Sequence, residues 1–410
     1  MSPESLIMPI PRDADKAFFA EIYHETSGPR KDIYIGHDQA SQMLAFHLHK
    51  QLDQLFYFKR GYNNRVYLAR CTDGSEYVIR LGGRFWDHTK ITNEAGALRL
   101  ARQALGDTVA VPTFVGTSIE EAKVHIEIED RIVPFDYIIM DRLPGVPLDS
   151  VWDDLSLDEK KDVAVQTAAI FAALRSIKLD AIGNFINGPG NQPEIGPMME
   201  GGQGPFATWD AFVAKNIAQE IKNMHDHKTN FAEIASFLPR LEQLIAKVRG
   251  GELEKQFEGE LTTIERPISF LHGDMESRNM LVVGSKIVGL HDFEFAGGFP
   301  SEQEWCAGFE WLFARAEDPF DESEQQKLRD MTGDEKELLD YFLKVLKGKH
   351  GILPYGRGHH EYKVVLYHLQ INIAPWWLRD VPRAQWTEGN HNSFKTAVGS
   401  LDKALTFLGC

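Results

Sequence analysis

The stretch that decides the fold is Phe270-Leu-His-Gly-Asp-Met-Glu-Ser-Arg-Asn279, which is followed by His291-Asp-Phe-Glu294. A short strand–turn–strand pattern separates the two. Asp274, Asn279 and Asp292 therefore follow the spacing D-x4-N-x12-D. This spacing lets three oxygen-bearing side chains converge from a loop and from the end of the hairpin that follows it.

Such a set of side chains matches the needs of phosphoryl transfer from ATP. Asp274 is the candidate base, a carboxylate that accepts the proton of an attacking hydroxyl. Asn279 and Asp292 offer hard oxygen ligands to Mg²⁺ on the phosphates. Taken singly, each of the three is more often a turn or capping residue. Their common register is what predicts a kinase-type active site.

The other residues of the motif leave alternatives open. For His272, we expect hydrogen bonds that brace the catalytic loop rather than acid–base chemistry. Glu294 is either a further acid at or behind the metal, or an exposed acid at the end of a strand. We expect His291 to be structural.

Composition and charge limit the class of protein. The 410 residues are 43% hydrophobic and 25% charged, as in ordinary globular proteins. The net charge of −16 argues against a nucleic-acid partner and fits either solubility or attraction of a cationic co-substrate. Three widely spaced cysteines give neither zinc spacing nor a disulfide framework. Without a signal peptide or an apolar run of about 18 residues, we expect a cytoplasmic protein with no membrane partner.

Strand patterns dominate the chain before residue 140. Residues 64–70 and 76–80 predict a β-hairpin with its turn at 72–74, and residues 109–117, 124–129 and 137–140 add strands. A helix over 94–105 follows a cap at Thr92-Asn93, and a short helix is expected near Lys16–Tyr23. We predict an extension at 1–45 and a small β-rich, nucleotide-binding lobe at 46–140.

Four side chains of this lobe are candidates for nucleotide binding. Asn63 and Asn64 end the turn Arg60–Asn64 and would supply donors to phosphates, although an ordinary hairpin turn explains them equally well. Arg80 would grip phosphate oxygens through its planar guanidinium, and Glu94 would pair with it. The alternative for Arg80 is an exposed arginine on a strand.

The strand that ends at Met140 leads into a predicted hinge at 141–147. The backbone of Asp141 to Leu143 would read the edge of adenine, and Met140 would pack on its ring; any strand leaving a core looks similar. The remainder, 148–410, is predicted as a large helical lobe with the catalytic loop and acceptor site. Within it, Ser156…Glu159 forms a capping box, and 187–205 is too rich in glycine and proline for regular structure.

The acceptor leaves only weak marks in the sequence. Residues 301–348 hold 13 acidic against 6 basic side chains, which suggests a cationic or amine-bearing acceptor. Trp305, Trp311, Trp376 and Trp377 are candidates for an aromatic wall, with core packing as the more common role for most of them. The 187–205 loop is a candidate cover for the acceptor.

Together these residues resemble the aminoglycoside phosphotransferase and choline kinase-like family, in its eukaryotic-type small-molecule kinase branch. The resemblance runs from about Tyr57 to Trp311 and continues more loosely to the C-terminus. The stretches that carry it are Gly61-Tyr-Asn-Asn-Arg-Val-Tyr67, Tyr77-Val-Ile-Arg80, Glu94, Ile139-Met-Asp-Arg-Leu-Pro-Gly145, His272-Gly-Asp…Asn279 and Asp292-Phe-Glu294.

The resemblance implies an α+β, protein-kinase-like, two-lobed fold that binds ATP and Mg²⁺ and phosphorylates a small-molecule hydroxyl. It implies Asp274 as the base, Asn279 and Asp292 on Mg²⁺, Arg80 on the phosphates and the 141–143 backbone on adenine. One departure is Arg80, where the family usually has lysine. A catalytically silent nucleotide-binding scaffold is the main alternative. A protein kinase is disfavoured by His-Gly-Asp and by the lack of an Ala-Pro-Glu segment.

Overall fold

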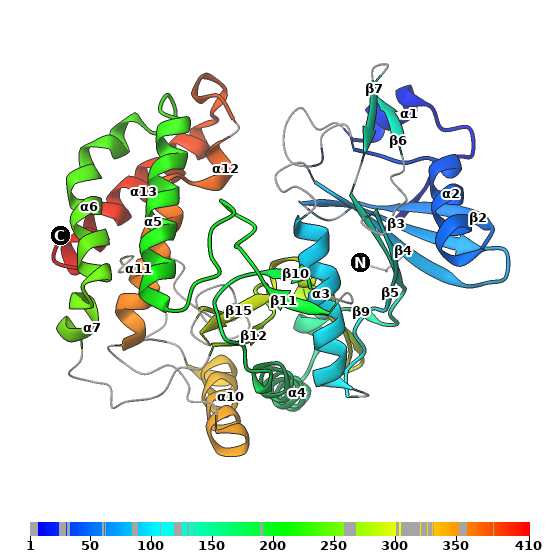
Figure 1. The fold of residues 1–410 in the computed structure, drawn as a ribbon. Helices are drawn as coiled ribbons and strands as arrows, with labels where there is room; N and C mark the ends of the chain where they lie inside the picture. Colours follow the sequence, from blue (N-terminus) through cyan, green and yellow to red (C-terminus); the bar gives the residue numbers. More distant parts are fainter. Residues whose placement is uncertain are drawn as a thin grey trace. The chain divides into compact units, whose positions relative to one another are not determined.

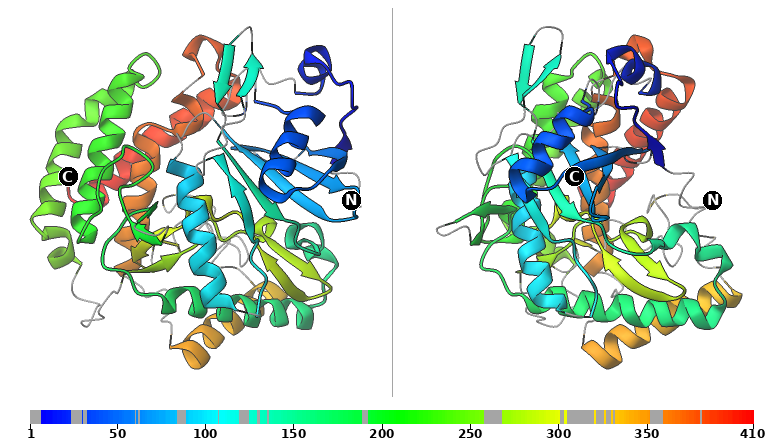
Figure 2. Two further views of the ribbon diagram at one scale, coloured as in Figure 1. Left: turned by 45° about the vertical axis from the view of Figure 1, so that its right-hand side comes forward. Right: turned by 90° about the vertical axis from the view of Figure 1, so that its right-hand side faces the viewer.

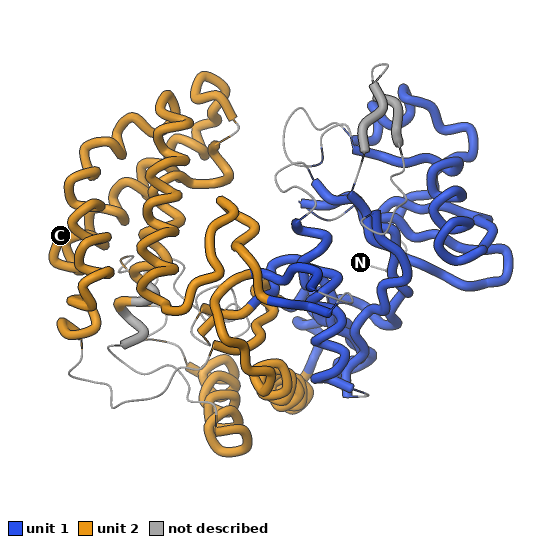
Figure 3. The backbone as a smooth tube through the Cα atoms, viewed as in Figure 1, with its two compact units in different colours: residues 1–155, 184–194, 277–297 blue, residues 156–183, 195–276, 298–410 orange. Residues whose placement is uncertain are grey.

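The structure is a computed structural model, and its chain divides into two compact units (Figure 3). Unit 1 comprises residues 1–155, 184–194 and 277–297, and unit 2 comprises 156–183, 195–276 and 298–410. The residues that the structure describes are 7–23, 30, 33–59, 61, 63–83, 89–106, 108–118, 125–128, 131–134, 136–188, 192–257, 268–300, 303–304, 320, 326, 330, 332–351, 359–379 and 381–410.

Unit 1 contains most of the described strands and the helices α1, α2 and α3 (Figure 1). Its elements are β1 (Ile7–Pro9), α1 (Lys16–Ile22), α2 (His37–Leu48), β2 (Leu52–Phe58), β3 (Asn64–Cys71), β4 (Glu76–Gly82), α3 (Thr89–Leu105), β5 (Phe114–Thr117), β6 (His125–Ile128), β7 (Arg131–Pro134), β8 (Tyr137–Asp141), β9 (Val146–Pro147), the 3₁₀ segments η3 (Leu148–Ser150) and η4 (Trp152–Asp154), β10 (Phe185–Asn187), β11 (Pro193–Ile195, at its border), η8 (Ser277–Asn279), β13 (Met280–Val283), β14 (Lys286–Leu290) and η9 (Phe293–Phe295).

A six-stranded sheet in the order β1-β2-β3-β4-β8-β5 forms the body of unit 1. The predicted hairpin is confirmed, because β3 and β4 pair antiparallel from Asn64↔Gly82 to Arg70↔Glu76. Side chains alternate between the two faces of a strand. One face, which includes Tyr67 and Ile79, packs with α1 and α2 in a single core (Figure 2). The opposite face of β4 carries Arg80.

Helix α3 is longer than predicted, and the predicted cap at Thr92-Asn93 is wrong. The helix begins at Thr89, so both residues lie inside it. The Asn93 side chain instead donates to the Glu294 carbonyl at 2.8 Å and accepts from the Phe185 amide at 2.6 Å. Asparagine is a common helix cap because it bonds nearby backbone; here the backbone that it bonds is distant in the chain.

The hairpin of β13 and β14 extends into a three-stranded sheet through β9. Two residues of the predicted hinge, Val146 and Pro147, pair with Val282 and Leu281. Gly145 makes this approach possible, since its φ is +97° and a Cβ there would lie 2.8 Å from the Val282 carbonyl oxygen.

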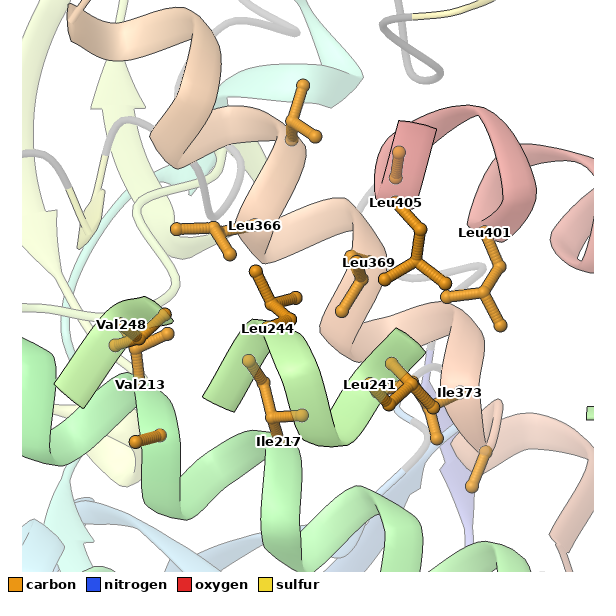
Figure 4. Close-up of a cluster of buried hydrophobic side chains, with 14 of the residues drawn as sticks. Val213, Ile217, Leu241, Leu244, Val248, Leu366, Leu369, Ile373, Leu401 and Leu405 are labelled. Carbon is orange, nitrogen blue, oxygen red and sulfur yellow. The ribbon is translucent and has the colours of Figure 1, made fainter. Parts of the chain in front are cut away.

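Unit 2 is mainly helical. Its elements are α4 (Leu157–Ser176), α5 (Trp209–Asp226), η6 (Ala232–Phe237), α6 (Leu238–Arg249), α7 (Glu252–Gln256), β12 (Ile268–Leu271), β15 (Gly297–Pro300, at its border), α10 (Gly333–His350), α11 (His359–Ile373), α12 (Trp376–Arg379), η11 (Arg383–Gln385) and α13 (Glu388–Phe407). Leucines, isoleucines and valines of α5, α6, α11 and α13 interlock in its core (Figure 4). None of the described helices combines the length and apolar character of a membrane span.

Two local predictions for this half of the chain had different outcomes. The capping box is confirmed, because the Ser156 amide and hydroxyl donate to Glu159 and the Glu159 amide donates to the Ser156 oxygen. The expectation of no regular structure at 187–205 is wrong in part. Strand β11 lies in this segment and pairs with β10, while residues 189–191 lie outside the described residues.

Candidate active site

Asn279 and Asp292 flank the β13–β14 hairpin in unit 1. Met280 pairs with Leu290, and the His291 amide donates to the Asn279 carbonyl at 3.0 Å, so the two ends of the hairpin lie side by side. Asp292 has a φ of +68°, an uncommon conformation outside glycine that Asp tolerates better than most residues. The predicted approach of Asn279 and Asp292 through a hairpin is therefore observed.

Arg80 lies against the same hairpin end. It is buried and forms ion pairs with both Glu94 and Asp292, and its Nη1 lies 3.8 Å from Glu294 Oε2. The expected Arg80–Glu94 pair is confirmed, and the alternative of an exposed strand arginine is wrong. The planar guanidinium holds its N–H donors in fixed directions and can donate to two carboxylates at once. The donors of a lysine ammonium group rotate freely and are less fixed in direction. Contact of Arg80 with phosphate stays a prediction.

Glu294 is a buried acid of unit 1 with several polar partners. It is 2% exposed, so the alternative of an exposed strand-end acid is wrong. Its Oε1 accepts from the Asn63 side chain at 2.8 Å and its Oε2 from the Asn64 side chain at 2.5 Å. Lys90, 1% exposed, lies 3.1 Å from the same Oε2. The amide donors expected for phosphates are thus directed at a carboxylate.

Sequence reasoning missed Lys90. Burial lowers the pKa of Lys90, and the Glu294 carboxylate opposes that shift. The one indication in the sequence was that Lys90 precedes Glu94 by four residues. This spacing also occurs on ordinary solvated helix faces. Its partner Glu294 lies about 200 residues away, beyond the reach of local patterns.

The predicted adenine-reading segment starts at the end of β8. Met140 is buried, and the amides of Asp141 and Arg142 donate to the carbonyls of Thr113 and Glu76. The Asp141 carboxylate accepts from the Thr113 amide at 2.5 Å. The N–H groups of Asp141 and Arg142 are thus engaged within the protein, and contact of the 141–143 backbone with adenine stays a prediction.

In unit 2, Asp274 directly follows His272 and Gly273, whose backbone amides are held by a buried glutamate. Glu304 Oε1 accepts from the amides of His272 at 2.8 Å and Gly273 at 3.2 Å. The Asp274 amide donates to His272 Nδ1 at 3.2 Å, which agrees with the expected bracing role of this histidine. Gly273 has a φ of +82°, where an L-residue is strained. Asp274 itself is half-buried.

Glu304 and Arg175 were also missed by the sequence reasoning. Glu304 is 2% exposed, and Arg175 Nη2 lies 3.6 Å from its Oε2. Arg175 lies in the predicted helical lobe, and Glu304 lies in the acidic 301–348 segment. Nothing in their spacing indicated the catalytic loop. Only the fold brings a buried carboxylate under the backbone of the motif.

The aromatic residues suggested for the acceptor separate into two groups. Trp305 and Trp311 lie outside the described residues. Trp376 is 47% exposed and meets Trp377 edge to face at 5.7 Å, while Trp377 packs against the core of unit 2. Trp376 is therefore partly exposed, and Trp377 has the packing role expected for most of them.

The donor set of unit 1 is compatible with a magnesium ion that is held mainly by phosphates. In the described part of the chain, no group of three His, Cys, Asp or Glu side chains is placed to hold a metal. Mg²⁺ in nucleotide sites commonly takes only one or two protein ligands besides phosphate oxygens and water. The Asn279 amide and the Asp292 carboxylate, at adjoining hairpin ends, would provide such a pair.

Comparisons with known proteins bear on the family and the fold. The model of the phosphotransferase enzyme family matches residues 57–300. Aminoglycoside phosphotransferase APH(4)-Ia is similar in structure at 17% identity, covering 91% of this chain and 99% of that one, with a TM-score of 0.51. A putative fructosamine-3-kinase from Thermobifida fusca is similar at 13% identity, covering 90% and 100%, with a TM-score of 0.51.

A third similar structure is the streptomycin-ATP-APH(2")-IIa ternary complex, at 14% identity, 90% and 99% coverage and a TM-score of 0.51. No curated protein matches the chain. At these identities the structural likeness shows the fold, and it confirms the predicted kinase-like α+β class. The family match covers more than half of the 410 residues, so the chain belongs to the phosphotransferase enzyme family.

Proposed function

We propose that the protein transfers the γ-phosphate of ATP to a hydroxyl group of a small, amine-bearing molecule. The observation that carries the proposal is the meeting of Asn279, Asp292 and the Arg80–Glu94 pair at one end of the β13–β14 hairpin. Family membership supports the reaction class. The described contacts support the proposal, because they hold the Arg80 guanidinium beside Glu94 and Asp292.

Each residue has one task in this reaction. Asp274 accepts the proton of the attacking hydroxyl, and Asn279 and Asp292 hold the metal ion. Arg80, oriented by Glu94, holds phosphate oxygens, and Leu143 provides backbone groups to adenine. Bound Mg²⁺ supplies charge neutralisation across the phosphates.

The amine-bearing acceptor rests on charge and on aromatic surface. The chain carries a net charge of −16, and the 301–348 segment has 13 acids against 6 bases. Trp376 presents an exposed ring, and a cation over an aromatic face gains about 0.5–2 kcal/mol. Two of the similar structures are aminoglycoside phosphotransferases, whose substrates carry amines.

The test is ATP consumption with Mg²⁺ against a panel of amino alcohols, aminoglycosides and sugars. We expect turnover of an amine-bearing member, and Asp274→Ala should lower it by about 10²- to 10⁴-fold. Asp226→Ala serves as the control, because Asp226 is exposed and pairs only with Lys222 in the described contacts. Nucleotide binding without turnover of any acceptor would favour the silent scaffold, and unchanged turnover in Asp274→Ala would remove the assigned base.

A further inference from the structure

We propose that Glu294 is a positioning residue that ties the Asn63-Asn64 loop to the Asp292 hairpin, rather than a ligand of the metal. The inference deepens the proposed function and rests on it, because it assigns the way in which the nucleotide-binding loop is held. Glu294 lies two residues beyond Asp292, so its placement bears directly on the site.

Both carboxylate oxygens of Glu294 are already engaged by donors of the protein. Oε1 accepts from Asn63 at 2.8 Å, and Oε2 accepts from Asn64 at 2.5 Å and faces Lys90 at 3.1 Å. A carboxylate that binds Mg²⁺ must direct an oxygen at the ion, close to about 2.1 Å. Here the oxygens are directed at the side-chain amides of Asn63 and Asn64, at the start of β3, and at the ammonium group of Lys90 on α3.

Lys90 explains how a carboxylate is tolerated at this depth. Glu294 and Lys90 are 2% and 1% exposed, and a buried charge is costly unless it is paired and hydrogen-bonded. The backbone of Glu294 is fixed as well, because the Asn93 side chain donates to the Glu294 carbonyl at 2.8 Å. Helix α3 thus holds Glu294 at two points, and Glu294 in turn holds the loop.

A loop held in this way is preorganised for phosphate. Asn63 precedes β3 and Asn64 begins it, opposite Gly82 in the β3–β4 ladder. Fixing both side chains restricts the backbone just before the strand, so less conformational entropy is lost when a ligand binds. Removing the Glu294 carboxylate should therefore weaken nucleotide binding without changing the Mg²⁺ concentration that binding requires.

The first experiment follows hydrogen–deuterium exchange in the protein without nucleotide. Glu294→Gln keeps the shape but loses the charge and sets an amide against Lys90. We expect faster exchange in peptides that span Asn63 and Asn64, and no change there in Asp73→Asn. Asp73 is a suitable control, because it is an exposed acid of unit 1 that pairs with Lys50. Unchanged exchange in Glu294→Gln would overturn the inference whether or not the protein binds nucleotide.

The second experiment measures binding of Mg²⁺·AMP-PNP by calorimetry, with Mg²⁺ titrated at fixed nucleotide. Glu294→Gln and the double variant Asn63→Ala/Asn64→Ala should each weaken binding by about tenfold, the combination no further, and the Mg²⁺ needed for half-saturation should not change. A raised Mg²⁺ requirement in Glu294→Gln alone would make Glu294 a metal ligand and overturn the inference. Absence of binding by the unmodified protein would count against the proposed function instead.

Discussion

Two buried glutamates, one in each unit, hold the loops of their own unit in different ways. In unit 1, Glu294 is paired with Lys90 and accepts from the side chains of Asn63 and Asn64. In unit 2, Glu304 lies near Arg175 and accepts from the backbone amides of His272 and Gly273. Each unit thus places a carboxylate and a buried cation behind a loop.

The difference lies in what each carboxylate holds. Backbone amides are present whatever the side chain, so the Glu304 anchor depends on the conformation of the loop. Side-chain amides belong to particular residues, so the Glu294 anchor depends on asparagine at both positions. We infer that the catalytic loop is sensitive to backbone geometry, whereas the loop before β3 is sensitive to side-chain identity.

The largest effect is expected from removing the anchor in unit 2. Glu304→Ala leaves the buried His272 amide and the part-buried Gly273 amide without this acceptor, and removes the carboxylate near Arg175. Breaking a buried pair in this way typically costs about 3–5 kcal/mol, and we expect a loss of that size in the free energy of unfolding by urea denaturation. Glu337→Ala is the control, because Glu337 is an exposed acid of unit 2 paired with Lys161. Equal losses in the two variants would contradict an anchoring role.

Glu220, a third buried acid, lies in unit 2 and should make the stability of the protein depend on pH. Burial raises the pKa of Glu220 to about 7, although Arg379, 2.6 Å away, acts in the opposite direction. A pKa raised in the folded state favours the protonated acid. This contribution to stability is therefore complete below the ordinary pKa of about 4.5 and is lost as the pH rises through about 7.

Glu220→Gln should abolish this dependence. The stability of the unmodified protein relative to the variant should fall by about 2–3 kcal/mol between pH 4.5 and pH 8, from 1.36 kcal/mol per pKa unit. Urea unfolding at several pH values measures the difference. Parallel pH profiles for the two proteins would mean that Arg379 keeps the acid ionised, in which case this glutamate is held by its cation in the way that Glu294 and Glu304 are.

The smallest effect on stability is expected from two glycines, one in each unit. Gly273 has a φ of +82° in the catalytic loop, and Gly284 has a φ of +61° in the β13–β14 turn with open space around it. Alanine at either site should cost about 1–2 kcal/mol, measured by thermal unfolding. Only Gly273→Ala should also lower turnover, by about tenfold or more, because it displaces the amides that bind Glu304. Equal turnover in both variants would contradict a loop held through its backbone.

Much of the site could be predicted from local spacing. The D-x4-N-x12-D pattern placed Asn279 and Asp292 at the ends of one hairpin, and the strand and helix patterns placed Arg80 opposite Glu94. These predictions succeeded because the partners lie within one or two adjacent elements, whose periodicity fixes which side chains share a face.

The tertiary structure alone decided which buried charges compensate one another. Asn64 and Glu294 are 230 residues apart, and His272 and Glu304 are 32 residues apart, with the β13–β14 hairpin between them in the chain. The need of a buried carboxylate for a cation or amide donors is general, but any suitable group meets it, so the sequence does not name the partner. The composition, the hairpins and the motif spacing could therefore be recognised from the sequence alone. Lys90, Arg175, Glu304 and the tertiary role of Asn93 became visible only when the folded chain brought distant polar groups out of water together.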